Sequence, residues 1–356
     1  MLLLPSSIAP SLIHAVCLLL SCALPSLFAA GLPERYLDAP PAKGPTVVRA
    51  TFELLDLNAI DDNAETFEFS GLLSLTWKDE RQAFDPETAG VKEKIYQGNF
   101  QFNEVSPAWY PQVFLANPSG SSETSVVLLR VLPDGTSTLV SNLNAVAKTD
   151  FAMRRFPFDR HELKAVFGLL GFASDRVVFE AAPPRRGQEV GLSQWWIEDV
   201  ECSTRERPSV SAGNGQASEW VVSLHVKRQA MFTLRLVVMP LALIVILSWS
   251  VFWMDRSALG DRINLSFVGI LTAVAYQIVV GDLLPHVSYV TLMHGFLNLS
   301  FFMMCAAVVI NLWVGLCDKQ GRLELGDRID RACRWIFPLG YLSLTALMSV
   351  LAFVLF

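Results

Sequence analysis

Four long apolar stretches follow one another near the C-terminal end of the chain, at residues 229–253, 261–283, 288–316 and 334–356. An α-helix rises about 1.5 Å per residue, so each stretch is long enough to cross a hydrocarbon core roughly 30 Å thick. The pattern therefore predicts four membrane-spanning helices, which together form a transmembrane domain at residues 229–356.

Residues 31–228 show a different pattern, with short runs rich in Val, Phe, Leu and Trp and no helical periodicity. Turn sequences separate these runs, for example at residues 117–120, 133–135 and 213–215. The pattern predicts strands at residues 47–57, 67–77, 125–132, 163–169, 176–180, 195–202 and 220–228. Many short strands of this kind favour an all-β, immunoglobulin-like antiparallel sandwich.

The first 30 residues are also apolar, and small residues stand just before the first polar stretch. This favours a cleaved signal peptide at residues 1–30, although the leading Lys or Arg is missing. Residues 19–22 leave open a lipoprotein cleavage box ending at Cys22. Removal of the signal places residues 31–228 outside the membrane. Basic residues in the link after the third apolar stretch then lie inside, as membrane proteins prefer; they are Lys319, Arg322, Arg328 and Arg331.

Composition supports a membrane protein and excludes other classes. The chain is 52% hydrophobic and 17% charged, which leaves too little charge for an ordinary cytosolic enzyme. A net charge of −6 without any basic run argues against nucleic acid as a partner. Cys202 is the only cysteine between residues 31 and 228, so no disulfide can form there within one chain.

Several short motifs occur in an order that is similar to a known family. They are Trp77-Lys78-Asp79-Glu80-Arg81 with Phe84, Trp109-Tyr110-Pro111, Phe156-Pro157-Phe158-Asp159, Arg228 before a first membrane stretch that contains Pro240, Leu284-Pro285, and Tyr289-Val290-Thr291. Together with four membrane stretches, this order resembles the pentameric ligand-gated ion channels, the Cys-loop receptor superfamily. Cysteines flank the Phe-Pro-Phe-Asp loop in much of that family, whereas Thr149 and Leu163 stand there in this chain. The chain thus resembles the bacterial branch, which lacks the disulfide.

The resemblance implies an outer β-sandwich, a four-helix transmembrane bundle and a homopentamer around a central pore. The partners of one chain would be four identical subunits, the lipid bilayer, permeant monovalent cations and an unknown small-molecule agonist, with protons or divalent ions as possible modulators. The location would be a bacterial inner membrane with the N-terminal domain in the periplasm. The link of about 17 residues expected before the fourth helix leaves no room for a cytoplasmic domain.

One stripe of the second membrane stretch carries the chemistry of an ion pathway. Its residues recur every three or four positions: Asp261, Asn264, Val268, Leu271, Ala275, Ile278 and Asp282. The two carboxylates are 21 residues apart, or roughly 32 Å along a helix, which places one at each membrane boundary. An apolar stripe alone is more often a lipid-facing or core surface, and the acidic ends are what favour a pore.

Five copies around an axis would turn this stripe into rings. Carboxylate rings at Asp261 and Asp282 would attract cations and repel anions, which predicts cation selectivity. Apolar rings at Leu271 and Ile278 would form a gate that closes by excluding water, and Asn264 would form a polar inner constriction. A salt bridge from Asp261 to Arg256 or Arg262 remains the alternative role for that carboxylate.

Opening requires coupling between the two domains. By resemblance, three loops meet there and carry Asp61, Asp62, Phe156, Pro157, Phe158, Asp159, Leu284, Pro285 and Tyr289. Arg228 at the domain boundary needs a carboxylate partner, with Asp159 as first choice and Asp61 or Asp62 as second. The alternative is that Arg228 only reaches lipid headgroups.

The agonist site is the least specified. By resemblance it lies between subunits, near Asn117 and the loops at residues 168–174 and 204–219, where the chain offers Phe172 and Trp220. Core packing is the alternative for Trp220, which begins a strand. The expected aromatic cage is incomplete.

No motif indicates an enzyme, a cofactor or a metal site, because the five histidines show no ligand spacing. His286 leaves pH sensitivity open. Two other functions remain as alternatives: a membrane-anchored receptor that does not conduct ions, and an ion-coupled transporter. A transporter would favour carboxylates at mid-membrane rather than at the ends.

Overall fold

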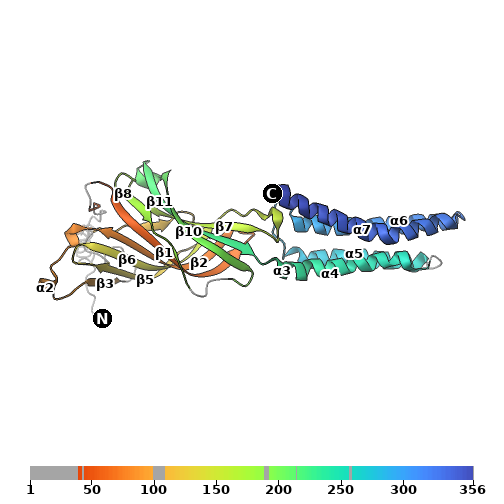
Figure 1. Ribbon diagram of the computed structural model, residues 1–356, viewed down its shortest axis with the longest axis horizontal. Coiled ribbons are helices and arrows are strands. Elements are labelled where there is room, and N and C mark those ends of the chain that lie inside the picture. Colours follow the sequence, from red (N-terminus) through yellow and green to blue (C-terminus); the bar gives the residue numbers. More distant parts are fainter. Residues whose placement is uncertain are drawn as a thin grey trace, which may run out of the picture. The chain divides into compact units, whose positions relative to one another are not determined.

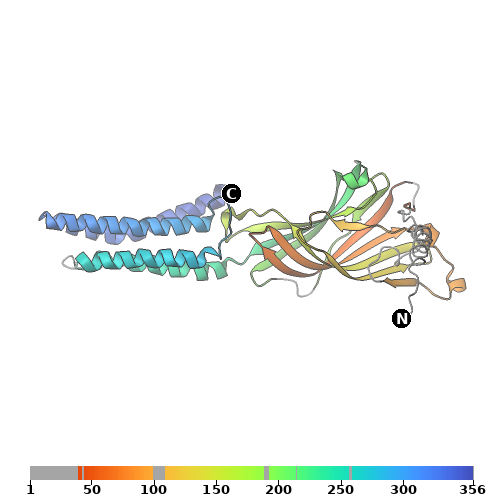
Figure 2. The same cartoon turned by 180° about the vertical axis from the view of Figure 1, so that it is seen from behind.

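The computed structural model describes residues 39–41, 44–98, 109–187, 192–213, 215–255 and 259–355. Residues 40–356 form one compact unit, which contains a β-sandwich followed along the chain by long helices (Figures 1 and 2). The predicted signal segment, residues 1–30, lies outside the described residues.

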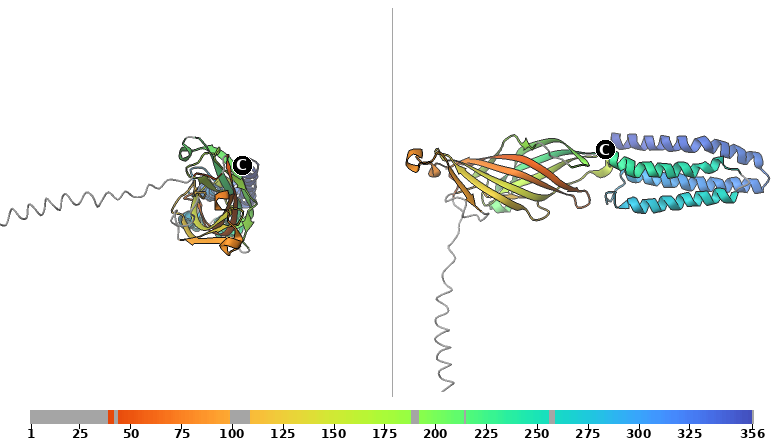
Figure 3. Two further views of the ribbon diagram at one scale, coloured as in Figure 1. Left: turned by 90° about the vertical axis from the view of Figure 1, so that its left-hand side faces the viewer. Right: turned by 90° about the horizontal axis from the view of Figure 1, so that it is seen from below.

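The sandwich consists of two sheets, which Figure 3 shows facing each other. The seven-stranded sheet has the order β3 (Lys94–Gly98), β5 (Glu123–Val131), β6 (Thr136–Lys148), β2 (Thr66–Lys78), β1 (Thr46–Asp61) and β8 (Val177–Ala181), and β9 (Arg185–Arg186) also pairs with β1. The four-stranded sheet has the order β10 (Trp195–Pro208), β11 (Gln216–Arg228), β7 (Arg160–Leu169) and β4 (Val113–Leu115). Short helical turns occupy the loops: η1 (Glu80–Gln82), α2 (Pro86–Ala89), η2 (Met153–Arg155) and η3 (Val210–Ala212).

All seven predicted strands are present, and β3, β4, β6 and β9 are additional. The long strand β6 escaped prediction because Leu139, Leu143 and Ala145 alternate with Thr, Ser and Asn along it. Such alternation is what a strand with one buried face requires. A search for continuous apolar runs therefore finds strands buried on both faces, such as β7 and β11, more easily than strands like β6.

A cluster of aromatic rings joins the two sheets. Phe52 of β1 contacts Phe69 of β2 within its own sheet, and it contacts Phe167 of β7 and Trp220 of β11 across the core at ring distances of 6.4 Å. All four side chains have almost no exposed surface. Burial of large aromatic groups is the main source of stability for such a sandwich.

Four helical segments follow the sandwich and run side by side (Figure 1). The first, Ala230–Trp253, comprises α3 (Ala230–Thr233), a π-helical segment (Leu234–Val238), α4 (Met239–Trp249) and a final tight turn (Ser250–Trp253). The others are α5 (Leu259–Gly281), α6 (Leu292–Lys319) and α7 (Leu323–Leu355). All four segments are long and apolar enough to cross a membrane.

The fourth helix differs from the prediction. It begins at Leu323 instead of residue 334, and the expected link of about 17 residues is a turn at residues 320–322. The added turns are amphipathic, with buried residues every three or four positions at Gly326, Asp330, Cys333, Phe337 and Tyr341. An expectation based on apolar length alone misses such an extension, because charged residues such as Glu324, Asp327 and Arg328 occupy its exposed face.

Candidate functional site

The predicted stripe of α5 lies on the face of the helix that its own chain leaves uncovered. Val268, Leu271 and Ile278 are 58%, 70% and 75% exposed. Asn264, Ala275 and the two carboxylates of the stripe are exposed as well. The opposite face is buried against neighbouring helices through Arg262, Ser266, Ala273 and Val280.

The uncovered arc of α5 is wider than the stripe, because Phe267 and Val279 are also exposed. Asp261 lies in the first turn of α5, and Asp282 follows its last residue. Asp282 also lines a cavity of about 340 Å³ together with Asp61 and Asp62 of the sandwich. The surface thus has an apolar middle with a carboxylate at each end.

Arg262 is not the partner of Asp261, and this alternative for the carboxylate is wrong. The guanidinium is fully buried and donates two hydrogen bonds to Asp330 of α7, at 3.1 Å and 2.9 Å. Its Nε donates to the carbonyl of Val251 at 2.9 Å. The pair ties the start of α5 to α7 and the end of the first membrane segment. Arg256, the other suggested partner, lies outside the described residues.

A second polar contact holds the outer half of α5. The hydroxyl of Tyr276 donates to the carbonyl of Leu236 at 2.6 Å and lies 3.2 Å from the carbonyl of Val237. Pro240 has no N–H group, so it cannot form the usual helical hydrogen bond to Leu236. The free carbonyl and the π-helical segment around it therefore follow from Pro240, and Tyr276 satisfies the group that Pro240 leaves open.

At the junction of sandwich and helices, Arg228 at the end of β11 forms a buried ionic cluster. Its Nε lies 3.0 Å and 3.1 Å from the two carboxylate oxygens of Asp159, and its Nη2 lies 2.7 Å from Asp62. His161 Nε2 lies 2.5 Å from Asp159. The guanidinium also packs 4.1 Å from the ring of Trp195. The expected pairing of Arg228 with Asp159 is confirmed, and Asp62 joins it.

The two carboxylates of this cluster differ in their acidity. For Asp159, burial opposes ionisation, but the His161 hydrogen bond and the charge of Arg228 outweigh it and hold its pKa below the ordinary 3.8. For Asp62, burial outweighs the attraction of Arg228 and raises its pKa above 3.8. The Asp159 pair is therefore the more firmly charged half of the cluster.

The three predicted loops meet beside this cluster. The amide of His286, in the link after α5, donates to the Asn63 side chain of the β1–β2 turn at 2.8 Å. Tyr289 accepts a hydrogen bond at its hydroxyl from the amide of Met153 in η2 at 2.9 Å, and Arg154 lies over its ring. Asp61 instead caps its own turn, by accepting from the amides of Asn63 and Ala64.

The Phe-Pro-Phe-Asp segment adds a contact to the last helix. Phe156, Pro157 and Asp159 are buried, whereas Phe158 is exposed and packs against Phe353 near the end of α7 at a ring distance of 5.8 Å. Arg155 donates to the carbonyl of Phe353. Leu284 and Pro285 in the link after α5 are also buried. The end of α7 thus reaches the same junction as the loops.

Two residues expected at the agonist site serve the fold instead. Trp220 is fully buried in the aromatic core, which agrees with core packing, the alternative role given for it above. The Asn117 amide donates to the carbonyls of Lys148 and Lys164 and accepts from the amide of Val166, which leaves little capacity for a ligand. Phe172 is partly exposed and meets the edge of Trp109 at 6.2 Å.

Sequence reasoning missed several members of these sites, namely Asn63, Met153, His161, Asp330 and Phe353. Met153 contacts Tyr289 through its backbone amide, so the identity of its side chain could not have predicted the contact. His161 could have been found, since it stands two residues after Asp159 on a strand and shares its face. Asp330 could have been found from the buried stripe of α7.

The family comparisons agree with this architecture. Residues 35–230 match the neurotransmitter-gated ion-channel ligand binding domain, and residues 237–323 match the neurotransmitter-gated ion-channel transmembrane region. The chain belongs to the neurotransmitter-gated ion-channel family, the pentameric Cys-loop superfamily, whose members are ligand-gated ion channels and not enzymes.

Individual relatives are distant but cover most of the chain. A proton-gated ion channel of Gloeobacter violaceus is 25% identical over 316 residues, which is 88% of this chain and 85% of the relative. The gamma-aminobutyric acid receptor subunit rho-2 of Homo sapiens is 25% identical over 75% of this chain, and subunit rho-1 of Rattus norvegicus is 24% identical over 83%. The chain spans 57% and 63% of these two receptor subunits.

Proposed function

We propose that five identical copies of this chain form a ligand-gated, cation-selective channel whose pore is lined by α5. The observation that carries the proposal is the uncovered face of α5, with an apolar middle and carboxylates at both ends, opposite a face that is packed within the chain. Within a membrane protein, such carboxylates are stable where they contact water. A water-filled pore around a fivefold axis on that side of α5 would provide this contact.

In this proposal Asp261 and Asp282 select for cations, Leu271 and Ile278 form the hydrophobic gate, and Asn264 forms the inner constriction. Val268 and Ala275 complete the lining. The buried Arg228 cluster and the loop contacts of Asn63 and Tyr289 transmit the movement of the sandwich to α5. The proposed location is a bacterial inner membrane, with a signal peptide removed and the sandwich in the periplasm.

The agonist would bind in the sandwich, between subunits, with Phe172 at its edge. Protons are the first agonist to test, because the Gloeobacter violaceus relative is a proton-gated channel and Asp62 has a raised pKa beside the coupling loops. As the pH falls from neutral, Asp62 takes up its proton before Asp159, which loosens one of the two ion pairs of Arg228.

The test is a reversal potential in a salt gradient across a planar bilayer that contains the purified protein. The wild-type reversal potential should lie near the cation equilibrium potential. In the double variant Asp261→Asn with Asp282→Asn, the reversal potential should move toward zero. The control Glu324→Gln, which replaces an exposed acid on α7, should leave the reversal potential unchanged. A wild-type potential that follows chloride would contradict cation selectivity, and the absence of current at every pH and ligand would favour a non-conducting receptor.

A further inference from the structure

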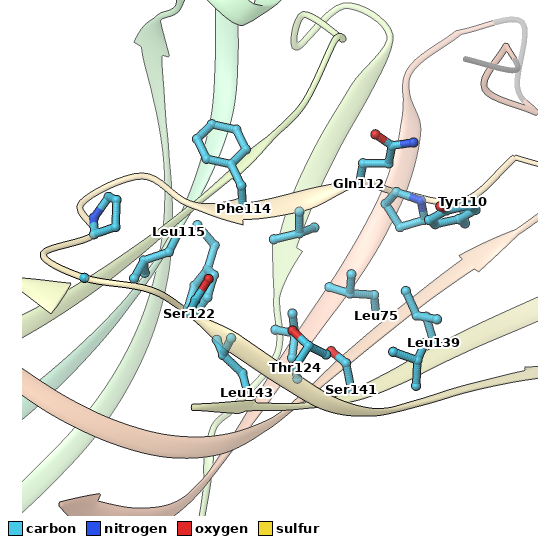
Figure 4. Close-up of a pocket in the computed structure, with 17 residues that line it drawn as sticks. Leu75, Tyr110, Gln112, Phe114, Leu115, Ser122, Thr124, Leu139, Ser141 and Leu143 are labelled. Carbon is cyan, nitrogen blue, oxygen red and sulfur yellow. The ribbon is translucent and has the colours of Figure 1, made fainter. Parts of the chain in front are cut away.

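Two interior regions of the chain differ in charge. The cavity of about 440 Å³ between the two sheets of the sandwich is lined, among the described residues, by side chains without formal charge (Figure 4). The interior of the helical bundle instead holds a full charge, because the guanidinium of Arg262 in α5 has no exposed surface. Arginine stays protonated in proteins, so this positive charge is permanent. It has no role in the pore as proposed so far.

Arg262 opposes the cation selectivity proposed for the inner mouth of the pore. It follows Asp261 directly in the chain and lies near the N-terminal end of α5, which carries a partial positive charge of its own. Five copies around an axis would therefore place five cations behind the ring of Asp261 carboxylates. The charges of these two side chains cancel each other, and the helix ends alone would then favour anions.

Asp330 of α7 supplies a compensating negative charge. Its carboxylate accepts two hydrogen bonds from the Arg262 guanidinium, at 2.9 Å and 3.1 Å, and its side chain is only 7% exposed. Bidentate pairs of this kind are among the strongest hydrogen-bonded contacts in proteins. Because the pair is neutral as a whole, its electric field falls off with distance much faster than the field of a single charge.

A second guanidinium makes the carboxylate of Asp330 more important. Arg334 follows Asp330 by four residues, so it lies on the same face of α7. It donates to the carbonyl of Phe252 at 2.9 Å and lies over the ring of Trp253. Both of these partners are neutral, so neither cancels its charge. Removal of the Asp330 charge would leave Arg262 and Arg334 to act together at this end of the bundle.

The surroundings keep the charge of Arg262 effective. Charges inside a helical bundle are screened by salt far less than exposed charges, and the effective dielectric constant there is lower than in water. An uncompensated Arg262 would therefore act on ions in a nearby pore. An exposed charge on the outside of α7 would be hidden by counterions.

We propose that Asp330 determines the cation selectivity of the inner mouth, although it lies on α7 and does not line the pore. It acts through Arg262: by neutralising that guanidinium, it leaves the Asp261 ring as the net charge that a passing ion meets. The inference rests on the proposed channel function and adds a residue of the fourth membrane helix to the selectivity of the pore helix. The competing role is purely mechanical, with Asp330 only holding the start of α5 in place.

Neutralising one or both members of the pair separates the two roles. The measurement is the cation-to-chloride permeability ratio, obtained from reversal potentials in a salt gradient across a planar bilayer. Asp330→Asn leaves Arg262 uncompensated in five subunits and should lower this ratio by about tenfold. The double variant Asp330→Asn with Arg262→Gln removes both charges and should return the ratio to the wild-type value. A mechanical role predicts that the double variant is at least as impaired as Asp330→Asn, because it has lost the guanidinium as well.

Two further variants are controls for charge and for position. Asp330→Glu keeps a negative charge beside Arg262 and should retain the wild-type ratio. Asp327→Asn removes the same charge from the exposed face of α7 and should also leave the ratio unchanged. An unchanged ratio in Asp330→Asn, or a double variant as unselective as Asp330→Asn, would overturn the inference.

The wild-type channel distinguishes a failure of this inference from a failure of the proposed function. A wild type that passes no current or follows chloride contradicts the proposed function, whereas cation selectivity that does not depend on Asp330 contradicts this inference alone. If five copies of Asp330→Asn do not assemble, pentamers that mix wild-type and variant subunits can be isolated with two affinity tags. Their permeability ratio should fall as the number of variant subunits rises, and a wild-type ratio in the mixed pentamers would overturn the inference.

Discussion

At the scale of single residues, the junction depends on one guanidinium shared by two unequal carboxylates. Arg228 and Asp159 are buried and Asp62 is partly exposed, so removing Arg228 leaves at least one buried carboxylate without its partner. Because the partners come from the β1–β2 turn and from the segment just before β7, the cluster ties two of the three predicted loops to the start of the first membrane segment.

Replacing Arg228 with Ala should abolish agonist-evoked current while leaving assembly intact, because Asp159 still retains its contact with His161. The measurement is whole-cell current together with the elution volume of the purified protein. Arg160→Ala, which removes an exposed pair with Glu198 on the same sheet, is the control and should behave as wild type. Wild-type currents from Arg228→Ala would contradict the coupling role.

The two carboxylates should differ in their effect on stability. The ionised form of Asp159, with its lowered pKa, contributes stability that is fully present above pH 3.8 and is lost as the pH falls through its folded-state pKa. The ionised form of Asp62, with its raised pKa, is less favourable in the folded state, and this penalty is relieved as the pH falls through that pKa.

At pH 7, Asp159→Asn should therefore lower the free energy of unfolding by about 3–5 kcal/mol, the usual effect of breaking a buried pair. Asp62→Asn should have a much smaller effect. Thermal unfolding of both variants gives the comparison, with the exposed Asp150→Asn as control. Equal losses from both substitutions would contradict this ranking of the two ion pairs.

At the scale of secondary-structure elements, the sequence predicts best the helices and strands that are marked by continuous apolar stretches. Apolar length located all four membrane segments, and apolar runs located seven strands. Prediction from apolar stretches failed at the start of α7, where charged residues continue the helix, and along β6, where polar residues alternate with apolar ones. Of the site, the Arg228–Asp159 pair was predictable because a buried Arg requires a carboxylate. The contacts of Met153 and Phe353 were not, because they depend on how distant segments pack.

The contact between α5 and the first membrane segment yields a prediction at this scale. Tyr276→Phe removes the hydroxyl that satisfies the Leu236 carbonyl and leaves that group without a partner in a dry environment. The loss should lower the free energy of unfolding by about 1–3 kcal/mol. Thermal unfolding in detergent measures it, and Tyr96→Phe in the sandwich is the matched control. An unchanged unfolding temperature would mean that water reaches this carbonyl.

At the scale of the whole molecule, the proposed channel would close where the apolar middle of its pore excludes water. Leu271→Ser puts a hydroxyl in each of five subunits at the middle of the gate, so the wetted state becomes more favourable and opening becomes easier. Single-channel records should show a higher open probability. Leu342→Ser on the exposed surface of α7 is the control. An unchanged or reduced open probability for Leu271→Ser would argue against this gate.

The most direct test of the account asks which side of α5 faces water. Single cysteines are placed along the helix, in a background whose native cysteines are replaced by serine, and a positively charged thiol reagent is applied to open channels. Cysteines at Leu271, Ala275 and Ile278 should react and block the current, whereas cysteines at Ser266, Ala273 and Val280 should not. Reaction on the packed face, or only at Phe267 and Val279, would show that the predicted stripe does not line the pore.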